Sequence, residues 1–63
     1  MITNLYMGAV DGTEIILVNT GANIARFQHG GGNIRYYLGG NYDLQPNGVV
    51  TMVFVGGNWY IND

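Results

Sequence analysis

One pair of carboxylates stands close enough in the sequence to suggest acid–base chemistry. Asp11 and Glu14 flank a glycine, and a turn there would bring their side chains near each other. A glycosidase needs two carboxyl groups roughly 5 to 10 Å apart, one as general acid and the other as nucleophile or base. However, Asp before Gly is also the usual composition of a tight hairpin turn. We therefore interpret Asp11 and Glu14 as solvated turn residues.

The tripeptide Gly-Gly-Asn is a second candidate, at residues 31–33, 39–41 and 56–58. Glycine-rich loops bind phosphate where a helix N-terminus follows them, and a P-loop also needs a lysine. The sequence has no lysine, strand-like residues follow each copy, and the uneven spacing argues against a regular repeat. The three copies are predicted to be corners at which strands restart, because Gly and Asn tolerate positive φ.

The remaining residues suggest neither a nucleophile nor a metal site. The chain has no serine, no cysteine and one histidine, and no threonine has an activating base nearby. Serine and cysteine nucleophiles and thiolate zinc sites are therefore excluded, and we expect no enzyme activity, no metal and no cofactor. His29 precedes three glycines. We interpret it as a structural residue that hydrogen-bonds a turn carbonyl or packs against an aromatic ring, rather than as a ligand contact, a pH-sensitive interface group or a metal ligand.

Aromatic residues are frequent, at 13% of the chain. Their faces can stack on sugar rings, which predicts a carbohydrate-binding surface built from Tyr36, Tyr42 and Trp59 as platforms, with Arg35 and Asp43 as polar contacts. The alternative is packing in the core or between subunits, because Tyr and Trp combine a large apolar body with a polar tip. Neighbouring residues point to opposite faces of a strand, so at most one of Tyr36 and Tyr37, and one of Trp59 and Tyr60, lies in the core.

The elements that position these residues are delimited by turn signals. Clusters of Gly, Asn, Asp and Pro recur about every seven to ten residues, and the runs between them are rich in β-branched and aromatic residues. No window has the length and the 3.6-residue period of a helix. This pattern predicts an all-β fold, a small antiparallel sandwich or meander of about six short strands. The expected strands are 13–19, 23–29, 33–38, 41–44, 49–55 and 58–62, with 24–37 forming an edge hairpin.

The length of 63 residues allows one domain, residues 1–63, with 1–7 as a leading segment. A core of this size is marginal by itself, no disulfide is available, and 48% of the residues are hydrophobic while 10% are charged. We therefore expect a homo-oligomer, with a homotrimer favoured. The strands within 14–20 and 49–55 are apolar on both faces, which favours a subunit contact over a closed barrel with exposed outward side chains. The predicted interface comprises Ile16, Val18, Val50, Met52 and Phe54.

Charge and hydropathy exclude two classes of partner. A net charge of −2 with two arginines cannot neutralise a nucleic-acid backbone. The longest apolar runs are about four residues, too short to span a membrane, and the start MITNLYMG lacks the features of a signal peptide. Whether the chain is a piece of a longer protein stays open.

The ordered motifs resemble a small all-β module of bacteriophage tail fibres and tail spikes. The resemblance covers roughly residues 8–61 and rests on Gly8, Asp11, Gly12, Ile15, Leu17, Asn19, Thr20, Gly21, Phe27, His29, Asn33, Ile34, Gly39, Gly40, Leu44, Pro46, Asn47, Gly48, Thr51, Gly56 and Trp59. It differs where charged strand positions are apolar or aromatic here, at 35–37 and 52–55, which indicates deeper burial in an assembly.

The resemblance implies a module near the C-terminal part of a homotrimeric, extracellular virion tail protein. Such a module assembles or caps the trimer and contributes to attachment, while any depolymerase activity belongs to a separate β-helical domain. A carbohydrate-binding module that recognises a host-surface glycan is the alternative. A hydrolase using Asp11 and Glu14 is the third and least favoured hypothesis.

Overall fold

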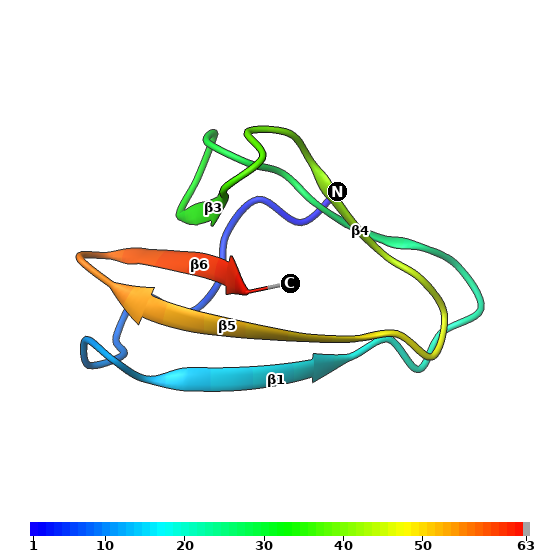
Figure 1. The fold of residues 1–63 in the computed structure, drawn as a ribbon, viewed down its shortest axis with the longest axis horizontal. Helices are drawn as coiled ribbons and strands as arrows, with labels where there is room; N and C mark the ends of the chain where they lie inside the picture. The colour runs from blue at the N-terminus through cyan, green and yellow to red at the C-terminus, as the bar shows by residue number, and fades with distance from the viewer. Residues whose placement is uncertain (63) are drawn as a thin grey trace.

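The computed structural model describes residues 1–62, and these form an all-β fold (Figure 1). The six strands are β1 (Glu14–Val18), β2 (Ala25–Phe27), β3 (Ile34–Tyr36), β4 (Tyr42–Leu44), β5 (Val49–Val55) and β6 (Asn58–Asn62). Each lies within a run that the turn signals delimit. The prediction of six short strands is therefore confirmed.

The strands form a four-stranded sheet in the order β1-β5-β6-β3 and a two-stranded sheet of β2 and β4. Of the predicted sandwich or meander, the structure has the sandwich, with two sheets. The prediction that all pairings are antiparallel is wrong in one respect, because β3 pairs with β6 in parallel. The expected hairpin over 24–37 is also wrong, since β2 and β3 belong to different sheets. The loop between them carries the chain from one layer to the other. The parallel pair of β3 and β6 needs a long crossover connection, which residues 37–57 supply by way of β4 and β5.

The core lies between the two sheets and is closed by the leading segment. The long sheet contributes the alternate residues that face inward, among them Val50, Met52, Phe54, Trp59 and Ile61, and the short sheet contributes Phe27 and Leu44. Leu5 of the leading segment and Ala9, which follows it, pack against this cluster. Alternation of inward and outward residues along each strand is the geometry expected for a sheet with one covered face.

This arrangement corrects part of the predicted subunit interface. Val50, Met52 and Phe54 are 2%, 0% and 4% exposed within the single chain. They face the chain's own core because the small sheet and the leading segment cover that side of β5. Ile16 and Val18 point the other way and are 70% and 54% exposed.

The three Gly-Gly-Asn copies are not equivalent corners. Gly56 and Gly57 have φ of 59° and 87° and join β5 to β6 in a two-residue turn, as a type I′ hairpin requires. In the second copy, positive φ occurs at Gly39 alone. In the first copy, residues 31–33, no residue has positive φ, although Gly30 just before it does. Of the non-glycine residues in 1–62, only Asn47 has positive φ. The prediction that the Asn of the motif supplies backbone freedom is therefore wrong.

The Asn of the first copy fastens the leading segment instead. Asn33 is 5% exposed; its Oδ1 accepts from the amide of Leu5 at 2.8 Å, and its Nδ2 donates to the Leu5 carbonyl at 2.9 Å. Trp59 Nε1 donates to the carbonyl of Tyr6 at 2.7 Å. A Cβ at Gly32 would collide with the carbonyl oxygen of Thr3, so glycine permits this close approach. The leading segment is thus an integral layer of the fold.

Candidate functional site

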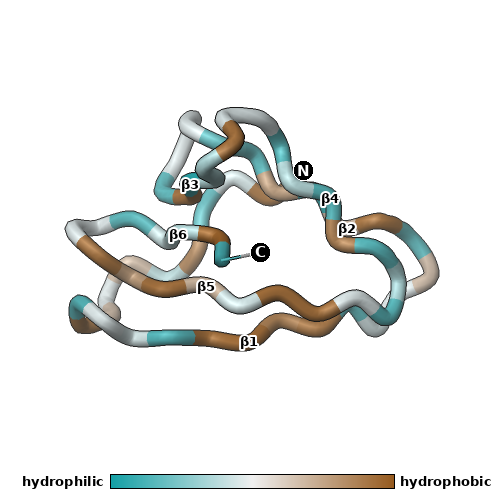
Figure 2. Tube along the Cα trace, viewed as in Figure 1, coloured by the Kyte–Doolittle hydropathy of each residue, from teal (hydrophilic) through white to brown (hydrophobic). Residues whose placement is uncertain are grey.

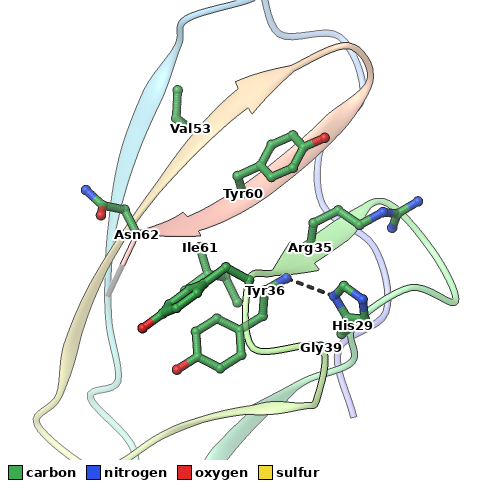
Figure 3. A pocket seen from close by; sticks show the side chains of 9 residues that line it. His29, Arg35, Tyr36, Gly39, Val53, Tyr60, Ile61 and Asn62 are labelled. Atoms are coloured by element: carbon green, nitrogen blue, oxygen red, sulfur yellow. Dashed lines mark hydrogen bonds between the residues drawn. The ribbon is translucent and has the colours of Figure 1, made fainter.

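An open pocket of about 580 Å³ lies at the β3 side of the four-stranded sheet (Figure 3). Its lining combines aromatic, cationic and amide side chains: His29, Arg35, Tyr36, Tyr37, Gly39, Val53, Tyr60, Ile61 and Asn62. The volume lies within the range typical of small-molecule sites, about 300–1,000 Å³. Because aromatic rings and several polar side chains converge on this pocket, it is the candidate functional site.

The sheet register positions the outer wall of the pocket. The parallel pairing places Arg35 of β3 opposite Tyr60 of β6, and the antiparallel pairing places Tyr60 opposite Val53 of β5. All three side chains therefore project from the outer face, away from the core. Arg35 Nη1 donates to the carbonyls of Gly32 at 2.7 Å and Ile34 at 3.1 Å, and these two bonds orient the guanidinium.

His29, Tyr36 and Tyr37 line the inner wall of the pocket. The Tyr36 amide donates to His29 Nδ1 at 2.9 Å (Figure 3). An imidazole that accepts at Nδ1 in its neutral form carries its proton on Nε2. In place of the predicted hydrogen bond to a turn carbonyl, His29 accepts from the amide of the last residue of β3, and its side chain also lines the pocket. The ring of Tyr36 packs edge-on against Tyr37 at 5.4 Å and Tyr42 at 5.1 Å, between centroids.

The two arginines have different electrostatic environments. Arg26 Nε and Nη2 donate to the two carboxylate oxygens of Asp43 at 2.6 and 3.0 Å, on the solvent side of the short sheet. The hydrogen bond from Arg26, with its charge, lowers the pKa of Asp43, and the same bond raises the pKa of Arg26. Within residues 1–62, Arg35 forms no salt bridge. The pocket thus holds the cation whose charge no described carboxylate balances.

The structure brings together only part of the predicted carbohydrate site. Tyr36 and Arg35 line the pocket, and Tyr42 packs behind Tyr36. Trp59 cannot stack on a sugar, because it is 2% exposed and bonded to the leading segment. Asp43 lies on the other sheet, where Arg26 already occupies both of its carboxylate oxygens. The assignment of Trp59 is therefore wrong, and Asp43 is not among the residues that line this pocket.

Sequence reasoning missed Tyr37, Tyr60 and Asn62 as pocket residues. Tyr37 is 76% exposed and Tyr60 is 43% exposed, so each presents ring surface to solvent. The rule that adjacent strand residues face opposite sides allowed at most one member of Tyr36–Tyr37 and of Trp59–Tyr60 in the core, but it did not say which member faces outward. No signal in the sequence paired β3 with β6, and that pairing is what places Arg35 beside Tyr60.

The other candidates from the sequence have structural positions. Asp11 Oδ1 accepts from the amide of Gly56 at 3.0 Å and so ties the turn before β1 to the β5–β6 hairpin. Glu14 is exposed at the start of β1, on the outer face opposite Val53. No cluster of three or more potential metal ligands occurs among residues 1–62. The same part of the chain contains no helix long and apolar enough to cross a membrane.

Comparison with known proteins gives one match. The model of the phage depolymerase C-terminal beta sandwich domain matches residues 1–60. Searches of curated proteins and of solved structures find no match. The matched range includes the leading segment, all of β1 to β5 and most of β6, in agreement with the two-sheet architecture. The chain therefore belongs to the family of phage depolymerase C-terminal β-sandwich domains, which are structural modules of phage tail spikes.

Proposed function

We propose that this domain is a non-catalytic homotrimerisation or capping module of a phage tail spike, acting in the extracellular virion tail and contributing to attachment. Its exposed apolar sheet face is the observation that carries the proposal. A depolymerase reaction, where the whole protein performs one, is assigned to another domain. The likeness to tail spikes supports the proposal of a trimer, and the exposed apolar face of the single chain supports the choice of contact face.

The outer apolar patch consists of Ile16, Val18 and Val49. Ile16 and Val18 are alternate residues of β1, and Val18 pairs directly with Val49 of β5, so the three side chains adjoin on one face. They are 70%, 54% and 57% exposed. Figure 2 shows the hydrophobic run along β1 and β5 at one border of the molecule. Contiguous apolar surface on a soluble domain typically marks an interaction site.

The size of the chain gives a physical reason to cover this patch. A small domain without disulfides has little stability to spare, and burying one Ile or Val side chain contributes roughly 1.5–3 kcal/mol. A symmetric trimer repeats each such contact three times. Association through β1 and β5 would therefore stabilise the fold as well as join the subunits.

Light scattering coupled to size-exclusion chromatography tests the proposal on the 63-residue chain. We expect a trimer at micromolar concentration, and a monomer after Ile16→Lys, because a charge would be buried against the apolar neighbours of each copy. Val10→Lys is the matched control, because Val10 is 77% exposed but lies before β1, outside the outer apolar patch. A monomeric wild-type chain, or equal dissociation by both substitutions, would contradict the proposed interface.

A further inference from the structure

We propose that the pocket at the β3 side of the sheet binds an acidic saccharide unit, with the sugar carboxylate on Arg35 and the ring against Tyr37 and Tyr60. This inference rests on the attachment role proposed above and names the ligand class for it. It uses a different part of the outer face from the trimer contact. The outer apolar patch lies on β1 and the first residue of β5, whereas the pocket lies on β3, β6 and the middle of β5.

Charge selects an anionic ligand. The chain has two arginines, no lysine and a net charge of −2. Asp43 balances Arg26, while Arg35 has no ion pair among residues 1–62 and lines the pocket. Its Nη1 is held by two main-chain carbonyls, which fix the guanidinium without neutralising it. A guanidinium fork matches the geometry of a carboxylate better than any other side chain.

The surroundings of Arg35 select a sugar over a small inorganic anion. Tyr37 and Tyr60 present exposed ring surface, and Val53 and Ile61 extend the apolar wall. A phosphate or sulfate has no apolar face for such a wall, and one arginine without a helix N-terminus is a weak site for it. A pyranose has both an apolar face and polar groups. Its C–H face stacks on aromatic rings, and its hydroxyls form hydrogen bonds. The amide of Asn62 and the Nε2 proton of His29 offer partners for those hydroxyls.

A matched pair of sugars tests the carboxylate requirement. Methyl β-D-glucuronide and methyl β-D-glucoside share the same ring and differ only in whether carbon 6 is a carboxylate or a hydroxymethyl group. Each is titrated into the isotope-labelled 63-residue chain while amide and arginine Nε–H resonances are recorded. We expect the glucuronide to shift the resonances of Arg35, Tyr37 and Tyr60 with a dissociation constant of about 1–10 mM. The glucoside should bind at least about tenfold more weakly.

Charge-matched variants separate the pocket from general electrostatics. Arg35→Gln and Arg26→Gln change the net charge equally, but only Arg35 lines the pocket. We expect Arg35→Gln to abolish the preference for the glucuronide and Arg26→Gln to retain it. Arg35→Lys restores the charge, so a partial return of the preference separates loss of charge from loss of fold. Tyr60→Ala should weaken both sugars several-fold, while Tyr60→Phe, which keeps the ring, should not.

Several results would overturn the inference. These are equal affinity for the two sugars, unchanged preference in Arg35→Gln, shifts confined to residues outside the pocket, or acetate binding as tightly as the glucuronide. The last result would indicate a plain anion site. Light scattering on the same samples keeps the two proposals distinct, because a monomer that binds the glucuronide refutes only the trimer. A trimer whose pocket resonances do not shift refutes only the saccharide site.

Discussion

Replacement of Asn33 by alanine tests whether the leading segment is an integral layer of the sandwich. The Asn33 side chain is buried and forms reciprocal hydrogen bonds with the amide and the carbonyl of Leu5, at 2.8 and 2.9 Å. Each such bond contributes a net stability of about 1 kcal/mol, and a part-buried main-chain group left unpaired adds a further penalty. Asn33→Ala should therefore lower the free energy of unfolding by about 2–4 kcal/mol.

Urea unfolding followed by the fluorescence of Trp59, the sole tryptophan, measures this loss. Trp59 is 2% exposed and bonded to Tyr6 of the leading segment, so its emission reports on the same region. A small domain without disulfides has about 3–5 kcal/mol in total, and the variant should lie close to its unfolding transition in the absence of urea. All samples need one protein concentration, because association would shift the apparent stability.

Asn41→Ala is the matched control, since Asn41 is exposed in the second Gly-Gly-Asn copy and accepts only a long bond of 3.4 Å from the His29 amide. Its cost should stay within about 0.5 kcal/mol. A stability of Asn33→Ala within that same margin of the wild type would refute the role assigned to Asn33. Rapid hydrogen exchange at the Leu5 amide in the wild type would refute it independently.

Two further predictions concern the turns and the surface charges. Gly57→Ala should destabilise the chain by about 1–2 kcal/mol in the same unfolding assay, because φ is 87° there. Gly40→Ala should be neutral or slightly stabilising, because a Cβ there meets open space and φ is not positive. An equal loss of stability in the two variants would contradict this prediction. The pKa of Asp43 lies below its ordinary 3.8 through the hydrogen bond and charge of Arg26, so its contribution to stability is present above pH 3.8 and is lost as pH falls through the lower folded value. Carbon-detected titration should show the pKa of Asp43 rising in Arg26→Gln, and an unchanged midpoint would refute the assigned cause.

The sequence by itself located the six strands, although four of them are shorter than the predicted runs. Glycine and asparagine clusters interrupt runs of β-branched and aromatic residues. Whether a segment forms a strand or a turn depends here on the residue types within that segment, so it can be inferred from the sequence. The same local reasoning predicted that at most one of Trp59 and Tyr60 lies in the core, and Trp59 is buried while Tyr60 is exposed. It also excluded serine and cysteine chemistry, because those residue types are missing.

Only the tertiary structure decided which strands pair and which apolar face is covered. β5 is apolar on both faces, so its sequence is compatible with either face in the core. The leading segment and the β2–β4 sheet cover the face of Val50, Met52 and Phe54, and that face is therefore the core. The parallel pairing of β3 with β6 joins segments more than twenty residues apart. That contact moves the candidate site away from Trp59 and Asp43, and it sets Arg35 beside Tyr60. Pairing between distant strands depends on the sum of many contacts across the core, which no local pattern encodes.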